Sequence, residues 1–235
     1  MDRKVLKSKF TGSMIGTAVG DALGAGLEGH GWVNRDQLLA ITESRGTLVY
    51  TDDTHMMIGI AESLIEKKGF DGEHMTYRFM ENFKLEPWRG YGPGPPRVFR
   101  SIQAGEAWNE AAGKLYGSGS FGNGSAMRVA PVGLLYYDNP SKVRDIAYKS
   151  SQITHAHELG KEGAATQAYA VALATGADPS LPLSIDEFLN KLSGFIRQAV
   201  FQEKVRQAKG NRRAGAWHRS LQLCASSYLF LFMLP

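Results

Sequence analysis

The chain has 235 residues, of which 43% are hydrophobic, and this content supports one large globular domain or two small ones. Its single cysteine, Cys224, excludes an internal disulfide, and no signal peptide is recognisable. The longest apolar run, residues 228–235, is far shorter than the roughly 20 residues that span a bilayer. We therefore expect a cytoplasmic protein with no membrane segment. The net charge is +4, but residues 197–235 carry seven basic residues and one acid, which leaves residues 1–196 at −2 and argues against nucleic-acid binding across the fold.

The opening segment has the apolar spacing of a helix, with one face formed by Phe10, Met14, Ala18 and Ala22. Glycines recur at positions 12, 16, 20 and 24 of the same segment. Because a glycine costs a helix about 1 kcal/mol, this repeat predicts the close approach of another backbone. Just beyond it Glu28 stands among small residues, where a ligand or a metal can reach it; the alternative is a solvated loop acid.

A run of oxygen-bearing side chains, Thr51-Asp52-Asp53-Thr54, stands directly before a strongly helical segment. Hard divalent cations such as Mg²⁺ prefer oxygen ligands, and this run offers several within one turn of backbone. We interpret it as a metal site, with helix capping, for which Asp and Thr are also preferred, as the alternative. The helix that follows is expected to bury one face, formed by Met57, Ile60, Ala61, Leu64 and Ile65.

The next segments alternate between helical and loop patterns. Residues 33–41 are a short helical candidate before the acidic run, and residues 73–83 have the spacing of a helix with inward-facing Met75, Phe79, Met80 and Phe83. Glycine and proline alternate over residues 89–96, which excludes regular structure there. The pattern predicts a loop that leads into a helix over residues 98–107.

Residues 117–128 form the second informative stretch, because glycine and serine dominate its first half. Such density lets the backbone turn its N–H groups toward an anion, and a helix beginning near Ser125 would add its positive end. The stretch lacks the lysine of a Walker A loop and follows no strand pattern, so neither the P-loop nor the Rossmann motif fits. It predicts a phosphate-binding loop, with an ordinary Gly/Ser loop as the alternative.

The C-terminal part of the chain carries two helix-start signals. Asn139 and Pro140 are typical of the N-cap and the first position of a helix, and Ser184 with Glu187 forms a capping box. The helix after the capping box is expected to bury Phe188, Leu189, Leu192, Phe195, Ile196 and Val200.

Between these two helices, Thr154-His155-Ala156-His157 precedes an alanine-rich helix over residues 163–175. Two histidines at i and i+2 do not share a helix face, so we discount a zinc pair. Either one of them bonds a polar ligand or both are structural. No alternating strand pattern and no internal repeat are recognisable, so the chain is predicted to be all-α.

Four motifs in this order make the chain resemble the ADP-ribosylglycohydrolase family over roughly residues 10–175. They are Gly20-Asp21-Ala22-Leu23-Gly24 with Glu28, Tyr50-Thr51-Asp52-Asp53-Thr54, Gly119-Ser120-Phe121-Gly122-Asn123-Gly124-Ser125-Ala126-Met127-Arg128, and Thr154-His155-Ala156-His157. The resemblance implies a compact all-α fold with two Mg²⁺ or Mn²⁺ ions. It also implies hydrolysis of the glycosidic bond between ADP-ribose and an amino-acid side chain or small acceptor.

The resemblance assigns roles to individual residues. It implies metal ligation by Thr51, Asp52, Asp53 and Glu28, and catalytic roles for Glu28, a mobile acid near the metals, and Asp53. It implies substrate binding by Ser120, Phe121, Gly122, Asn123, Gly124, Ser125, Met127 and His157. The expected partner is an ADP-ribosylated protein or a small ADP-ribose conjugate, bound by a monomer.

The end of the chain departs from the family pattern. A second acidic motif of the form Gly-Asp-x-Asp-Thr is missing from this sequence, whose last acid is Glu203. Residues 1–209 are expected to form the family domain and residues 210–235 an anomalous tail. Back-translation from Gly215 with permitted codons, read one nucleotide later, gives a peptide similar to the family segment before that motif, so we expect a frameshifted or truncated C-terminus. Impaired metal binding and activity are then expected, and a non-catalytic ADP-ribose-binding or structural protein is the alternative.

Overall fold

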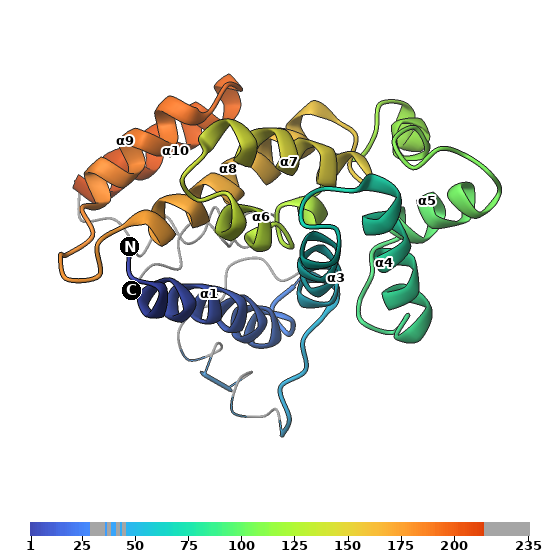
Figure 1. The fold of residues 1–235 in the computed structure, drawn as a ribbon, viewed down its shortest axis with the longest axis horizontal. Helices are drawn as coiled ribbons and strands as arrows, with labels where there is room; N and C mark the ends of the chain where they lie inside the picture. The colour runs from blue at the N-terminus through green and yellow to red at the C-terminus, as the bar shows by residue number, and fades with distance from the viewer. Residues whose placement is uncertain (29–35, 37–38, 41–42, 44–45, 214–235) are drawn as a thin grey trace.

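The computed structural model describes residues 1–28, 36, 39–40, 43 and 46–213 (Figure 1). Within this part of the chain every regular element is a helix, which confirms the predicted all-α class. The helices are α1 (Arg3–Gly24), α3 (Asp52–Glu66), α4 (Gly72–Leu85), α5 (Gly94–Gln103), α6 (Ala130–Leu135), α7 (Pro140–Gln152), α8 (Glu158–Gly176), α9 (Ile185–Phe195) and α10 (Ala199–Arg213), with the 3-10 helices η1 (Ala111–Gly117) and η2 (Asn123–Ser125). The helix expected over residues 33–41 lies largely outside the described residues.

The helices are arranged around α6, α7 and α8, which pack on one another at the centre of the molecule (Figure 1). The α9–α10 pair covers α8 at one end, and α3 and α4 pack together toward the other end, with α5 beyond them. Helix α1 lies alongside and contacts α3, α6 and α8. This arrangement brings the end of α1 to the start of α3, where the acidic run lies.

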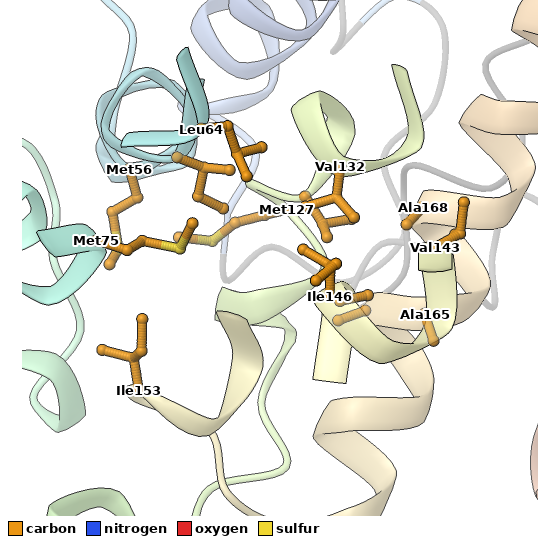
Figure 2. Packing of buried hydrophobic residues seen from close by; sticks show 14 of the residues in the cluster. Met56, Leu64, Met75, Met127, Val132, Val143, Ile146, Ile153, Ala165 and Ala168 are labelled. Carbon is orange, nitrogen blue, oxygen red and sulfur yellow. The ribbon is translucent and has the colours of Figure 1, made fainter. Parts of the chain in front are cut away.

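One apolar cluster joins most of these helices. It contains Met56, Ile60 and Leu64 of α3, Met75 and Phe79 of α4, Val132 of α6, and Val143, Ile146 and Ala147 of α7, with a row of alanines from α8. Figure 2 shows Met127, near the end of the glycine-rich stretch, among these side chains. A smaller cluster between α8, α9 and α10 includes Leu192 and Phe201. The end of the glycine-rich stretch is therefore anchored in the main core.

The local helix-start signals are confirmed. Asn139 is the N-cap of α7 and accepts a hydrogen bond from the amide of Lys142, and Ser184 caps α9 through the amide of Glu187. In contrast, α5 begins at Gly94, inside the segment predicted to be a loop, and ends at Gln103 rather than at residue 107. Its prolines stand in the first helical turn, where the missing N–H groups are not needed.

Three expectations about helix faces are wrong. Ile65 is 77% exposed because the buried stripe of α3 follows Met57, Ile60 and Leu64, and the next residue lies outside it. Val200 is 51% exposed because the helix is interrupted between α9 and α10. The second helix therefore starts with a new rotational phase, and Phe201 faces the core instead of Val200. Cβ atoms added at glycines 12, 16 and 24 would meet no atom within 4 Å, so at these three of the four repeated glycines the predicted close approach of a backbone is not found among the described residues.

The expected boundary at residue 209 falls inside α10, which continues to Arg213. Residues 214–235, most of the tail singled out in the sequence, lie outside the described residues. None of the helices in the described part of the chain is both long enough and apolar enough to cross a bilayer.

Candidate active site

The carboxylate of Asp21, near the end of α1, holds the beginning of α3. It accepts hydrogen bonds from the amide of Thr51 at 2.9 and 3.0 Å and from the amide of Thr54 at 3.0 Å. The hydroxyls of both threonines also donate to it, each at 2.6 Å. A buried carboxylate at a helix N-terminus satisfies free N–H groups and complements the helix dipole. Asp21 was part of a quoted motif, but the sequence assigned it no role.

This arrangement bears on whether the acidic run is a helix cap. Thr51 occupies the N-cap position of α3, yet its side chain makes no capping hydrogen bond, because Asp21 supplies the cap from another helix. Asp52 and Asp53 lie in the first turn of α3, where each carboxylate has a hydrogen bond to its own backbone amide. The capping interpretation therefore fails for the Thr51 side chain, whereas the two carboxylates satisfy first-turn amides and still have lone pairs that a ligand could use.

Crowding of acids shapes the electrostatics of this turn. Burial, helped by the negative charges of Asp21, Asp52 and Glu28, raises the pKa of Asp53 to about 8. Burial and the nearby Glu28 and Asp21 raise the pKa of Asp52 to about 7, while Arg128 opposes that shift. Shielding by protein and the charge of Asp21 also raise the pKa of Glu28, whose side chain lies exposed in the turn after α1. A cation would relieve this repulsion.

The residues of the acidic turn could supply part of a metal site. Thr51, Asp52, Asp53 and Glu28 offer oxygen atoms alone, the donor type that Mg²⁺ and Mn²⁺ prefer. Within the described ranges, however, no three Asp, Glu, His or Cys side chains converge closely enough to hold an ion. The donor chemistry fits a hard divalent ion, and the described donors could supply at most one side of its coordination.

Arg128 connects the glycine-rich stretch to this turn. Its side chain is fully buried, with Nη1 3.4 Å from the sulfur of Met56 in α3 and Nη2 donating to the Ser150 carbonyl at 3.0 Å. The guanidinium also lies 4.4 Å from the ring centre of Phe79. Burial lowers the pKa of Arg128 to about 9. Because Met56 is one turn from Asp52, the end of the glycine-rich stretch lies beside the acidic turn.

The glycine-rich loop packs tightly onto residues 155–160. Gly119 has a φ of +86°, and a Cβ there would lie 2.7 Å from the backbone nitrogen of His157. A Cβ at Gly124 would lie 2.5 Å from Cε1 of His155. A side chain at Gly119 would therefore force backbone atoms to shift, and one at Gly124 would force the His155 ring to move. The tip of the loop faces solvent: Phe121 is 63% exposed, Gly122 and Asn123 are exposed, and Ser120 is half-buried.

The end of the loop supports its shape. Ser125 is buried and donates through its hydroxyl to the Gly160 carbonyl at 3.1 Å, and Met127 packs in the main core. The helix expected near Ser125 is absent from this described stretch, since only the short η2 forms and α6 begins at Ala130. Pro131 lies in the first turn of α6, the position that proline favours. Any anion at this loop would be held by loop amides rather than by a helix end.

Both histidines of the Thr-His-Ala-His motif lie against the loop. His157 caps α8, accepting from the amide of Leu159 at 3.1 Å, and its ring centre lies 5.3 Å from that of Phe121. His155, which the sequence did not single out, is buried with Nδ1 2.8 Å from the hydroxyl of Thr154. Burial and the charge of Arg128 lower the pKa of His155 to about 3, so its ring is neutral. Its place next to Gly124 could not be read from spacing alone.

Comparisons with known proteins point to one family. A model of the ADP-ribosylglycohydrolase family matches residues 2–229. The chain is 36% identical to ADP-ribosylhydrolase ARH3 of Mus musculus, covering 81% of this chain and 54% of that protein, and 37% identical to ARH3 of Homo sapiens, covering 80% and 55%. The chain thus spans about half the length of these relatives. A solved ADP-ribosylglycohydrolase-related protein complex has a similar fold, with a TM-score of 0.65 at 23% identity over 86% of this chain and 68% of the other.

Proposed function

Because the chain belongs to the ADP-ribosylglycohydrolase family, we propose that it binds ADP-ribosylated substrates and hydrolyses the glycosidic bond between ADP-ribose and an amino-acid side chain or small acceptor. The observation that supports the proposal is the contact of Arg128, at the end of the glycine-rich stretch, with Met56, which lies one turn from the carboxylate of Asp52. An anion-binding loop next to a cation-binding turn suits a substrate with a diphosphate and a ribose.

The cation-binding side would consist of Thr51, Asp52 and Asp53, with Glu28 reaching in from the turn after α1. Bound Mg²⁺ or Mn²⁺ ions would supply positive charge that holds ribose hydroxyls and polarises a water. The hydrogen bonds from Thr51 to Asp21 leave lone pairs on the Thr51 hydroxyl oxygen and orient it. Glu28 and Asp53 are the carboxylates that would handle the proton; the pKa of Asp53, raised to about 8, suits proton transfer near neutral pH, and the pKa of Glu28 is raised in the same direction.

The anion-binding side would consist of the loop from Ser120 to Gly124. Backbone N–H groups of an exposed glycine-rich turn can converge on a phosphate oxygen without any lysine. His155 lies against Gly124 as a neutral ring. A neutral imidazole carries one N–H, and this group could donate a hydrogen bond to the anion from Nε2. The exposed ring of Phe121, with His157 beside it, offers a flat surface for a planar group such as a base.

The incomplete donor set favours reduced activity. The sequence lacks the second acidic motif of the family pattern, and in the described part of the chain no three Asp, Glu, His or Cys side chains come close enough together to hold an ion. We therefore propose weak metal binding and slow turnover for this chain. The same observation favours a second candidate function, a non-catalytic protein of this fold that binds ADP-ribose.

Calorimetry with ADP-ribose, with and without Mg²⁺, and release of ADP-ribose from a modified protein test both candidates. Metal-dependent binding with measurable release supports the hydrolase, and tight binding without release at any Mg²⁺ concentration supports the binding protein. Failure to bind ADP-ribose under either condition excludes both.

A matched pair of variants tests the loop itself. Gly124→Ala should weaken ADP-ribose binding by about tenfold or more, because the added methyl must displace His155 at a cost of about 1–3 kcal/mol. Gly113→Ala, where a Cβ would meet no atom within 4 Å, serves as the control. Equal affinities for the two variants would remove the loop from the binding site.

A further inference from the structure

The segment that carries the proposed metal ligands is held from two sides. In Figure 1, α3 lies between α1 and α4. From the α1 side, Asp21 binds Thr51 and Thr54. From the α4 side, the end of that helix and the chain after it bind Tyr50 and His55, the residues at either end of the segment. The proposed function assigns no role to the contacts made from the α4 side.

Arg89 is the principal contact on the α4 side. Its Nη1 donates to the carbonyl of Tyr50 at 3.0 Å, and its guanidinium carbon lies 3.9 Å from the centre of the Tyr50 ring. Its other nitrogens form a two-pronged pair with Glu86, at 2.8 and 3.1 Å. A planar guanidinium held by a carboxylate on one edge and stacked on a ring has little freedom to move.

Two further contacts secure the far end of the segment. The hydroxyl of Tyr91 lies 3.0 Å from Nδ1 of His55, and Asn82 donates to the His55 carbonyl at 3.1 Å. Between Arg89 and Tyr91, a Cβ added at Gly90 would lie 3.8 Å from Oδ1 of Asp52. The chain after α4 therefore lies directly against the acidic turn.

One peptide group receives both supports. The carbonyl of Tyr50 and the amide of Thr51 belong to the same planar unit; Arg89 binds its oxygen and Asp21 binds its N–H. Two hydrogen bonds, one at each end, fix the orientation of this peptide plane. The orientation of the plane in turn sets the positions of the Thr51 and Asp52 Cα atoms, from which the ligand side chains extend. Asp21 by itself holds only the N–H side of the plane.

We propose that Arg89 is a positioning residue for the metal ligands Thr51 and Asp52, acting through the Tyr50 carbonyl. The proposal rests on the proposed function in taking these two residues to be ligands. Partners that orient metal ligands are typically worth 10–100-fold in metal affinity. Lysine cannot reproduce the fork or the stacking, so Arg89→Lys should behave more like a deletion than like the wild type.

The test compares Arg89→Met with Arg78→Met. Arg78 also joins α4 to α3, through a pair with Glu62, but it lies away from the first turn of α3. Mn²⁺ affinity is measured by electron paramagnetic resonance, and amide hydrogen exchange at residues 51–55 is measured on the full chain without metal. We expect Arg89→Met to weaken Mn²⁺ binding about tenfold or more and to speed exchange at Thr51 and Thr54. Arg78→Met should stay within about twofold of the wild type in both measurements.

The inference is overturned if Arg89→Met leaves both measurements unchanged, or if Arg78→Met changes them as much. If the wild-type chain binds no Mn²⁺, metal dependence in the proposed function fails, and so does positioning of metal ligands by Arg89. Mn²⁺ binding by the wild type with no loss in Arg89→Met removes the inference and leaves the proposed function intact.

Discussion

Two groups of buried charged side chains in this protein differ in how their charge is balanced. Between α7 and α8, Glu162 is completely buried and is bound by Arg144 at 2.7 Å, by Tyr148 and by the amide of Arg197 at 2.5 Å. Between α1 and α3, Asp53 is 8% exposed and faces Asp21, Asp52 and Glu28. Both carboxylates are buried, but Glu162 is surrounded by a cation and hydrogen-bond donors, whereas Asp53 is surrounded by other acids.

The pKa values follow the partners. Burial alone would raise the pKa of Glu162, but hydrogen bonds from Tyr148 and the Arg197 amide, with the charge of Arg144, lower it below its ordinary value. Burial and neighbouring acids raise the pKa of Asp53 to about 8. Removing one partner of a compensated buried pair leaves a costly buried charge, whereas acids crowded together without a cation are the pattern expected of a functional site.

The largest expected effect comes from breaking the compensated pair. Arg144→Met should lower the free energy of unfolding by about 3–5 kcal/mol, because Glu162 would keep its charge in a buried site without its cation. Urea denaturation measures this loss. Lys149→Met, which removes an exposed pair with Asp145, is the control and should cost less than about 1 kcal/mol. If Arg144→Met costs no more free energy of unfolding than the control, the buried group between α7 and α8 does not depend on its cation for stability.

Arg128 provides an intermediate case, since it is fully buried but its Nε has no partner among the described residues. Arg128→Met should cost about 1–3 kcal/mol, less than Arg144→Met, because the substitution also removes an unsatisfied buried group. The same denaturation measurement ranks the two. A larger loss of unfolding free energy in Arg128→Met than in Arg144→Met would contradict this ranking.

Removing an uncompensated acid should have the opposite sign. Asp53→Asn relieves repulsion in the acidic turn, so the metal-free protein should gain about 1 kcal/mol of stability at pH 8 while Mn²⁺ binding is lost. Asp145→Asn, at an exposed position, is the matched control for both measurements. If Asp53→Asn destabilises the metal-free chain, the turn is structural and the contrast with Glu162 disappears.

The most gradual effect is a pH dependence that differs between the two regions. Carboxylates whose folded pKa is raised bind more protons in the native state, so their contribution to stability falls as pH rises from 3.8 toward about 7 for Asp52 and about 8 for Asp53. Glu162, with a lowered pKa, contributes stability above 4.5 that is lost as pH falls. Unfolding measured from pH 5 to 9 should therefore show metal-free stability decreasing with pH, and Mg²⁺ should flatten the slope. A slope unchanged in Asp53→Asn would assign it to other groups.

Sequence reasoning succeeded where the cause is local. The cap at Asn139, the N-cap at Ser184 and the helical spacing of Met57, Ile60 and Leu64 depend on residues within one or two turns, and all three are confirmed. It failed at Ile65 and Val200 because the width of a buried stripe, and the point where a helix stops, depend on what packs against it.

The candidate site divides in the same way. The sequence by itself determined the all-α class, the family and the oxygen-rich and glycine-rich stretches, because these are properties of residue type and of near neighbours. Only the tertiary structure decided that Asp21 and Arg89 grip one peptide group before α3, and that His155 lies against Gly124. Those contacts join residues 30 or more positions apart, and no local pattern encodes which distant side chain will complete a hydrogen bond or fill the space beside a glycine.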